Sequence, residues 1–448
     1  MSEPHLNLKI YHLQQIDSQT LTRLRNRAQN VIEEKTEEVS SIVSQVREHG
    51  DLALIEFSKK FDNVALEISD LRVKSHEFVD AEHGLSEGMK RAVDIAARNI
   101  RTFHERCMPR QMWLTQIDGE ILVGEKISAL DSAGLYVPRG RGSFPSVLLM
   151  LAIPAKVAGV RQIVVCTPPG EKGEVDAATL YAAQRCGIET VFRVGGAQAI
   201  AAMGYGTKTI PAVVKIVGPG NPYVSAAKRL LVGSVDVGLP AGPSEAIVLA
   251  DNTADPNHVV LDLLGEAEHG PDSSALLVTN AEQLASKVAD LADDQIRSLP
   301  SPRREFCEKV FANFGGIILT PNLVNAIEFV NEYAPEHLEI LTANPWEILM
   351  QIRNAGEILI GDSTPISVSN YCIGVNAILP TGRFARSFSP VGVNDFLKRS
   401  EIASLTRSGF EALRETALQF AEYEGFPAHA SAVRKRYLRD QMEPNRRD

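Results

Sequence analysis

The chain has 448 residues, of which 44% are hydrophobic and 23% charged, as expected for a globular protein of two or three domains. Its formal net charge of −10 argues against nucleic acid or an anionic membrane surface as the main partner. Five scattered cysteines without a Cys-x-x-Cys spacing argue against a disulfide framework and fit a reducing compartment. No secretory signal and no run of about 18 apolar residues is visible, so we expect a cytoplasmic protein with no membrane partner.

Basic residues gather only at Arg139–Arg141 and in the tail from Arg434 to Arg447, which we interpret as a solvated chain end. From the N-terminus, apolar residues spaced by three and four predict amphipathic helices over 32–46 and 89–100. The pattern then alternates short apolar runs with helical segments such as 177–186 and 281–299, and it returns to helix over 391–439. The predicted strands are 121–123, 134–137, 162–166, 190–194, 213–217, 246–249, 275–278, 316–319, 339–341 and 357–360.

Nearly all-apolar strands that alternate with helices indicate parallel sheets covered on both faces. The number of elements predicts two α/β units. One is compact and spans roughly 130–240, and the other is formed by the chain on either side of it.

The segment Glu266-Ala-Glu-His269-Gly-Pro-Asp272 follows the apolar helical run 259–264, and Gly270-Pro271 ends that helix. Because Glu266 and His269 are three residues apart, they share one face of a helix and can form half of a metal site. The alternative is a polar helix end at which His269 interacts with the last carbonyls.

Two glycine clusters follow predicted strands. Gly195-Gly196 leads into a small-residue helix, and Gly218-Pro-Gly-Asn221 precedes another. Backbone N–H groups in such turns can face a phosphate, although tight strand-to-helix turns also need glycine for steric reasons alone.

Three further blocks carry polar groups. Ser244 lies in a rigid Pro-Gly-Pro path without the elbow motif of a nucleophilic serine, so we do not interpret it as a nucleophile. Glu336 and His337 begin a predicted strand and are either an acid–base pair or a loop ion pair. His429, considered alone, is typical of a surface histidine.

Together these blocks resemble the histidinol dehydrogenase family over residues 30–437. The resemblance is carried by Gly134–Pro138, Val194–Ala202, Gly218–Asn221, Pro240–Glu245, Ala267–Ser273, Pro335–Leu338, and Glu424 with His429. It implies two incomplete Rossmann-like domains with helical N- and C-terminal extensions, assembled as an intertwined homodimer. It also implies oxidation of an amino alcohol through the aldehyde to the acid, with two NAD used in turn and one Zn²⁺ per chain.

The resemblance also implies a domain division. We expect an N-terminal helical arm over 1–29 and an inserted NAD-binding domain over 134–244. Residues 30–133 and 245–388 would form the discontinuous domain with most metal and catalytic residues, and 389–448 a helical extension with His429.

Residue by residue, the resemblance makes Glu336 and His337 the acid–base pair. His337 would take the alcohol proton, and Glu336 would activate the water that hydrates the aldehyde. The NAD-contacting positions would be Tyr136, Gln198 and Asn221, and the substrate contacts Ser244, Glu424, His337 and the four metal ligands.

The chain departs from the family at the metal site. The family has glutamine where Glu266 stands and aspartate where Asn370 stands, in a block that here reads Ser369-Asn370-Tyr371. The two changes are opposite in charge, so the formal charge of the site is kept. We therefore predict that zinc binding survives through Glu266, His269, Asn370 and His429.

Further departures concern the substrate. Val375 and Ala377 stand where threonine and histidine are usual, and Arg139 stands where glycine is usual. A site that loses polar groups changes its discrimination between substrates. Oxidation of L-histidinol is the leading hypothesis, a paralogue acting on another small alcohol is the first alternative, and a catalytically silent metal- or nucleotide-binding protein is the second.

Overall fold

The computed structural model describes residues 8–27, 35–139 and 142–436. The described chain forms two compact units. The first contains the residues up to 108 together with 129–396, and the second contains 109–128 together with the residues from 397 onward. Arg141, Arg446, Arg447 and parts of the expected arm over 1–29 lie outside the described residues.

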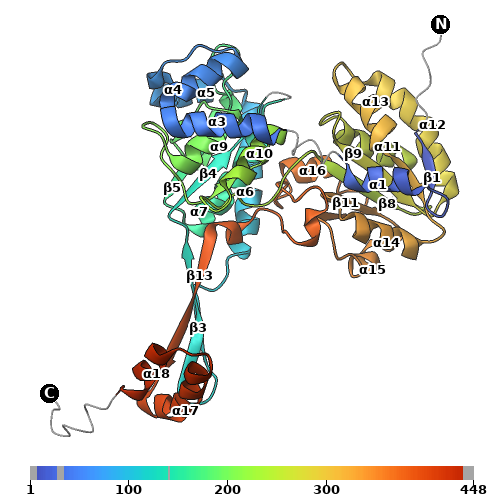
Figure 1. The fold of residues 1–448 in the computed structure, drawn as a ribbon. Coiled ribbons are helices and arrows are strands. Elements are labelled where there is room, and N and C mark those ends of the chain that lie inside the picture. The colour runs from blue at the N-terminus through green and yellow to red at the C-terminus, as the bar shows by residue number, and fades with distance from the viewer. Residues whose placement is uncertain (1–7, 28–34, 140–141, 437–448) are drawn as a thin grey trace. The chain divides into compact units, whose positions relative to one another are not determined.

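The larger sheet of the first unit has six strands in the spatial order β1-β10-β9-β8-β11-β12 (Figure 1). All neighbouring strands in it run parallel, which confirms the parallel α/β class predicted from the apolar runs. The strands are β1 Ile10–His12, β8 Glu245–Ala250, β9 Ser274–Thr279, β10 Gly316–Leu319, β11 His337–Leu341 and β12 Glu357–Ile360.

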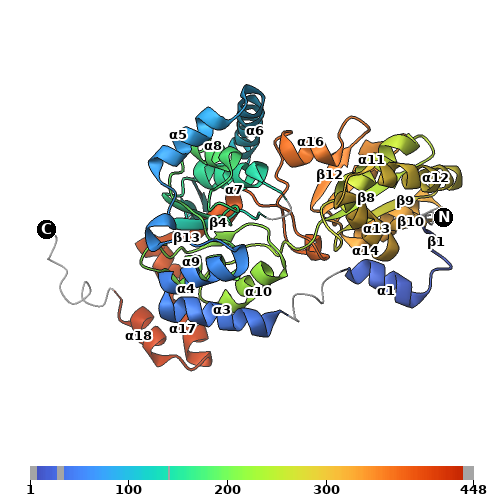
Figure 2. The same cartoon turned by 90° about the horizontal axis from the view of Figure 1, so that it is seen from above.

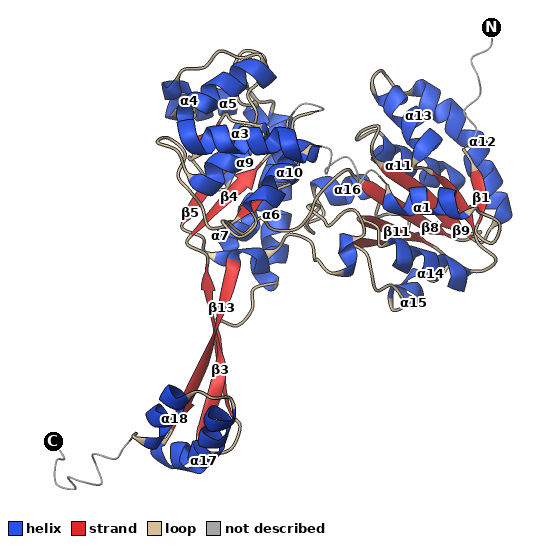
Figure 3. Cartoon of the chain, viewed as in Figure 1, coloured by secondary structure: helices blue, strands red, loops and turns tan. Residues whose placement is uncertain are grey.

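Helices cover both faces of this sheet, because alternate side chains of each strand point to opposite faces (Figure 3). Val248 and Leu277 pack on one face against α11 Pro256–Ala267, α12 Glu282–Ser298 and α13 Arg303–Asn313. Ile247 and Leu276 pack on the other face against α1 Ser18–Asn26, α14 Leu323–Tyr333 and α15 Pro345–Leu349.

The smaller sheet of the first unit has four parallel strands in the order β6-β5-β4-β7. They are β4 Ser132–Tyr136, β5 Gln162–Cys166, β6 Val191–Phe192 and β7 Ile216–Val217. The helices that connect them are α7 Pro145–Ala158, α8 Ala177–Arg185 and α9 Gly196–Tyr205, and α10 Pro222–Leu231 follows β7.

The N-terminal helices pack around the helices of this smaller sheet. α5 Ser75–Gly84 and α6 Glu87–Arg106 lie against α7 and α8, whereas α3 Thr36–His49 and α4 Asp51–Phe57 lie against α9 (Figure 2). Val39, Val43 and Leu54 share one buried core with Ile200. The apolar stripes of these helices thus pack against the helices of the smaller sheet, a long-range contact that helical periodicity does not encode. The expected division, which joined 30–133 to 245–388, stays a prediction.

The second unit is a three-stranded sheet, in the order β13-β3-β2, with two helices. Its strands are β2 Met112–Gln116, β3 Ile121–Ala129 and β13 Leu397–Leu405, and its helices are α17 Arg407–Tyr423 and α18 Pro427–Arg434. The prediction of continuous helix from residue 391 is wrong for β13. This strand is largely exposed, so it lacks the alternation of apolar and polar residues that reveals a half-buried strand.

The remaining short elements connect the larger ones. They are helical turns at Ser58–Asp62, Ile68–Asp70, Phe384–Arg386 and Val393–Phe396, and the helix α16 Ile366–Tyr371. All ten predicted strands are confirmed as elements, and β1, β2 and β13 are additional. The five cysteines are free. In the described part of the chain, every helix is too short or too polar to cross a membrane.

One histidine lies inside the apolar stripe of α6. His104 continues the buried series Val93, Ala96 and Ile100, and both of its ring nitrogens lack a hydrogen-bond partner among the described residues. Burial lowers the pKa of His104 to about 4, so the folded protein holds this ring neutral.

We predict that this ring makes the protein acid-sensitive. Because the folded pKa lies below the ordinary value, the unfolded state binds the extra proton first, and the contribution of His104 to stability falls as the pH drops from about 6.5 towards 4. At pH 5 the loss is about 2 kcal/mol relative to neutral pH. Denaturant unfolding of wild type and His104→Phe at both pH values measures it. An equal pH dependence in the two proteins would contradict the assignment.

Candidate active site and cofactor cavity

Acidic and basic side chains gather where three neighbouring strands of the larger sheet begin. Glu245 begins β8, His337 begins β11 and Glu357 begins β12. In the sheet register His337 lies beside Ala246 on one side and Glu357 on the other. Parallel strands bring their first residues to one edge, so this amino edge of the sheet collects residues that are 20 to 112 positions apart in the chain.

Each nitrogen of the His337 ring faces a carboxylate. Nδ1 lies 2.5 Å from Oε1 of Glu357, and Nε2 lies 3.8 Å from Oε1 of Glu336. The second oxygen of Glu336 accepts a hydrogen bond of 2.9 Å from the Glu245 backbone N–H. The second oxygen of Glu357 accepts one of 2.6 Å from the Ser369 hydroxyl. Every contact in this network is therefore fixed by backbone or by a buried side chain.

Burial and mutual charge set the protonation of the pair. Burial raises the pKa of Glu336 well above its ordinary value, although the imidazolium of His337 opposes that shift. Burial lowers the pKa of His337, but the carboxylates of Glu336 and Glu357 outweigh it and raise the pKa to about 10. Without bound ligands, the pair holds a proton at neutral pH. Burial distinguishes this pair from an ion pair in an exposed loop.

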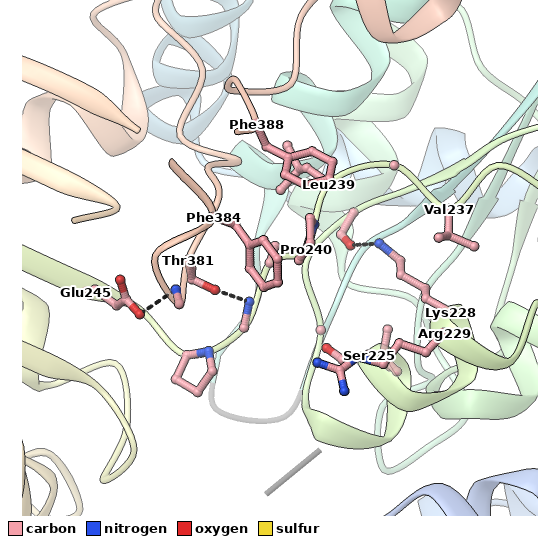
Figure 4. Close-up of a pocket in the computed structure, with 18 of the residues that line it drawn as sticks. Ser225, Lys228, Arg229, Val237, Leu239, Pro240, Glu245, Thr381, Phe384 and Phe388 are labelled. Carbon is pink, nitrogen blue, oxygen red and sulfur yellow. Dashed lines mark hydrogen bonds between the residues drawn. The ribbon is translucent and has the colours of Figure 1, made fainter. Parts of the chain in front are cut away.

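Glu245, at the start of β8, contacts residues from two distant parts of the chain. Its Oε1 lies 3.1 Å from Nε of the buried Arg27, and it accepts a hydrogen bond of 2.7 Å from the Gly382 N–H. In the preceding Pro-Gly-Pro path, the Gly242 N–H donates to the Thr381 hydroxyl at 2.7 Å (Figure 4). These bonds border a cavity of about 370 Å³, and they hold the segment that carries Ser244.

The expected metal pair lies at the end of α11. Glu266 is fully buried, and neither of its carboxylate oxygens has a hydrogen-bond partner among the described residues. His269 follows after the helix ends, with Nδ1 3.2 Å from the Ser244 hydroxyl. A buried carboxylate without a partner is strongly unfavourable unless a cation binds it. The residues present therefore fit a metal ion.

The other two expected ligands lie on different elements. Asn370 is half-buried in α16, next to Ser369, whereas His429 is exposed on α18 in the second unit. Glu424 is likewise exposed, at the end of α17. Within the described residues, no group of three or more His, Cys, Asp or Glu side chains is placed to hold a metal.

The three expected NAD-contacting residues line one cavity. Tyr136, Gln198 and Asn221 all border a space of about 1070 Å³. Tyr136 ends β4, and its hydroxyl accepts a hydrogen bond of 3.1 Å from the Gly196 N–H. The cavity therefore lies at the carboxyl edge of the smaller sheet.

Backbone geometry explains why glycine stands in the two turns beside this cavity. Gly196 has φ +65°, and a Cβ there would lie 2.7 Å from Oε1 of Gln198. Gly218 has φ +135°, and a Cβ there would lie 2.1 Å from the Tyr136 carbonyl oxygen. Asn221 caps α10 through its side chain, which accepts from the Val224 N–H at 3.1 Å. A Cβ at either glycine would collide with neighbouring protein atoms, and the positive φ angles also favour glycine.

Several site residues were not found from the sequence. Glu245 lay in a quoted block but was given no role, and Arg27 lay in the region predicted as a helical arm. Glu357 contacts His337, and Ser369 contacts Glu357, only because β12 and α16 fold next to β11. Asp62 lines the larger cavity, and burial raises its pKa to about 6. A charged residue at the start of an otherwise apolar strand was the one available signal, and it applied to Glu245 and Glu357.

A buried carboxylate–imidazole pair at a sheet edge, together with a large glycine-lined cavity, defines the chain as an α/β enzyme. The family model described as Histidinol dehydrogenase matches residues 25–437. The histidinol dehydrogenase of Synechocystis sp. is 49% identical, with 96% of this chain and 99% of that protein covered. A protein of Colwellia psychrerythraea named histidinol dehydrogenase homolog is 45% identical, with 97% of each covered.

The solved structures agree with the sequence comparison. The crystal structure of histidinol dehydrogenase from Elizabethkingia anophelis matches with a TM-score of 0.88 and 33% identity, and it covers 96% of this chain and 98% of that one. The chain belongs to the histidinol dehydrogenase family of NAD-dependent oxidoreductases.

We predict opposite effects of Glu266→Gln on stability and on metal binding. Replacing an unpaired buried carboxylate by a neutral amide should stabilise the metal-free protein by on the order of 1 to 3 kcal/mol. The same change should lower its zinc affinity. Thermal unfolding of the chelated protein and metal analysis after zinc loading measure the two effects.

The matched control is Asp290→Asn, which removes one charge from an exposed position of α12. It should change neither quantity. If Glu266→Gln destabilises the metal-free protein and binds zinc as wild type does, Glu266 is not a metal ligand.

Proposed function

We propose that the protein oxidises L-histidinol through the aldehyde to L-histidine, using NAD and one zinc ion per chain. The observation that carries the proposal is the buried Glu336–His337 pair, which lies beside a buried carboxylate without a partner. Family membership over nearly the whole chain supports the reaction class.

For NAD, the proposed domain is residues 134–244, to which the helices between 36 and 106 add a covering layer. Its strand order β6-β5-β4-β7 corresponds to the first four strands of a doubly wound Rossmann-like sheet. Tyr136 follows β4, and Asn221 follows β7. These two strands flank the point where the strand order reverses, which is where such sheets bind ligands. The larger sheet would be the second Rossmann-like domain, with the order β10-β9-β8-β11-β12.

For zinc, the proposed ligands are Glu266, His269, Asn370 and His429. The charge of the amino edge supports a divalent cation. Arg27 offsets Glu245, and a protonated His337 offsets Glu336, which leaves Glu357 and Glu266 as two negative charges in a buried region. The carboxylate at 266 and the amide at 370 supply the same total charge as the family's glutamine and aspartate.

The mechanism follows from the positions of the two acid–base groups. When bound, NAD accepts hydride and zinc orients the substrate and polarises its bound groups. The Nε2 atom of His337 takes the hydroxyl proton as the alcohol loses hydride. Glu336, held by the Glu245 N–H, then takes a proton from the water that adds to the aldehyde, and loss of a second hydride from the hydrate gives the acid. The base in the first oxidation is the neutral ring of His337, whose Nδ1 hydrogen is donated to Glu357 and whose Nε2 lone pair accepts the proton.

Substrate binding is assigned to Ser244 and Glu424, together with His337 and the metal ligands.

We further propose a homodimer. The second unit exposes several large apolar side chains, as an assembly surface does. They include Trp113, Leu114, Phe420, Tyr423 and Phe426.

A second candidate function is oxidation of another small alcohol by the same chemistry. The observation that favours it is the loop after α16, where Val375 and Ala377 replace a hydroxyl and an imidazole. Asn376 holds this loop in place by donating to the Met150 carbonyl oxygen at 2.6 Å, so the apolar side chains are rigidly presented. A rigid pocket that lost two polar groups favours a substrate with fewer hydrogen-bonding groups than imidazole offers.

We predict NADH formation when purified protein is supplied with L-histidinol, NAD and Zn²⁺. His337→Ala should lower the rate by about 10²- to 10⁴-fold, the usual contribution of a general base, while zinc content stays near one per chain. Ser367→Ala, an exposed position on α16, serves as the control and should retain full activity.

The outcomes separate the hypotheses. NADH formation with another small alcohol but none with L-histidinol would establish the paralogue. A His337→Ala protein with wild-type turnover would mean that the base is misassigned. No NADH formation with any alcohol would favour a silent binding protein.

A further inference from the structure

We propose that Glu357 is a positioning residue for His337, and that Ser369 in turn positions Glu357. Together they form a buried chain from the Ser369 hydroxyl through the carboxylate to Nδ1 of the imidazole. The proposal rests on the proposed role of His337 as the base that takes the alcohol proton. It adds two residues to which neither the family resemblance nor the motifs assign a role.

The contact between His337 and Glu357 is built into the sheet. The two residues are register partners on the adjacent parallel strands β11 and β12, so their side chains leave the sheet next to each other. The distance of 2.5 Å between Nδ1 and Oε1 is that of a strong, charge-assisted hydrogen bond. Both side chains are almost entirely buried, so water does not compete for the bond.

Ser369 removes the remaining freedom of the carboxylate. Its hydroxyl donates to the second oxygen of Glu357 at 2.6 Å, and its own side chain is fully buried. The two oxygens of Glu357 therefore have one donor each, from α16 on one side and from β11 on the other. A carboxylate with both oxygens engaged cannot rotate without breaking a buried hydrogen bond, which is costly.

This arrangement determines which nitrogen of the His337 ring carries a hydrogen and which can accept a proton. An ionised carboxylate accepts but does not donate, so Nδ1 carries the hydrogen toward Glu357 in both the protonated and the neutral ring. In the neutral ring, which is the form that acts as the base, the free lone pair is therefore on Nε2. Nε2 is the nitrogen that faces Glu336, on the substrate side of the ring. As the ring takes up the alcohol proton, the negative charge of Glu357 stabilises the imidazolium that forms. Glu357 thus favours the first oxidation, in which His337 is the base, over the hydration step, in which Glu336 is.

The test compares the two half-reactions. NADH formation is measured separately with L-histidinol and with the corresponding aldehyde, in wild type, Glu357→Gln and Ser369→Ala. We expect Glu357→Gln to lower kcat for the alcohol by about 100-fold, and Ser369→Ala by about 10-fold, with KM within threefold of wild type. The rate with the aldehyde should fall by no more than about threefold. Ser367→Ala, on the exposed face of the same helix, should leave both rates unchanged.

A second readout does not depend on the substrate. The Nδ1 proton of His337, held by a buried carboxylate, should give a proton NMR signal at low field, outside the amide region. The signal should disappear in His337→Asn and move upfield in Glu357→Gln and Ser369→Ala. It identifies the hydrogen bond even if wild type does not oxidise L-histidinol, a result that would reject the proposed function without rejecting the pairing.

Equal losses on alcohol and aldehyde would overturn the proposal, because they would indicate a general structural role for Glu357. Unchanged rates in both variants, or the absence of a low-field signal that His337→Asn removes, would overturn it as well. Ser369→Ala keeps the test open if Glu357→Gln does not fold, since it removes a single hydroxyl and leaves the buried charge in place.

Discussion

The structure depends on the burial of four carboxylates at one edge of one sheet. Glu245, Glu266, Glu336 and Glu357 are all withdrawn from water where β8, β11 and β12 begin. Such a concentration of charge is stable only with matching protons, cations or hydrogen-bond donors. Arg27 forms an ion pair with Glu245, and backbone N–H groups donate to Glu245 and to Glu336. An imidazole and a hydroxyl form hydrogen bonds with Glu357. Neither oxygen of Glu266 has a hydrogen-bond partner among the described residues, and this observation supports the proposed role of Glu266 as a metal ligand.

This constraint also explains why different side chains stand at the edges of the two sheets. The larger sheet places an imidazole and carboxylates at its amino edge, whereas the cavity at the carboxyl edge of the smaller sheet is lined by glycines and neutral polar groups together with charged side chains such as Asp62 and Lys172. A phosphate-bearing cofactor needs close approach to backbone N–H groups, and proton transfer needs carboxylates and imidazole held out of water. Each requirement is met by a different edge, and the path from Pro240 to Glu245 connects the two.

Much of the fold was predictable, because buried parallel strands are short apolar runs that a single sequence reveals. The exposed strand β13 was not predictable, because a strand without buried side chains does not need to alternate apolar with polar residues. The Glu336–His337 pair and the 266–269 spacing could be predicted because each is local in sequence. Glu357 and Ser369 could not, because the contact of Glu357 with His337, and that of Ser369 with Glu357, exist only after β12 has paired with β11. The packing of α3 to α6 on the smaller sheet was missed for the same reason.

The account's central claim is that one site performs two successive oxidations on L-histidinol. The most direct test is the amount of NADH formed when a limiting, known quantity of L-histidinol is consumed to completion by zinc-loaded protein with excess NAD. The account predicts two NADH for each L-histidinol, with L-histidine as the product. One NADH per substrate with release of the aldehyde, or no NADH at all, would contradict it.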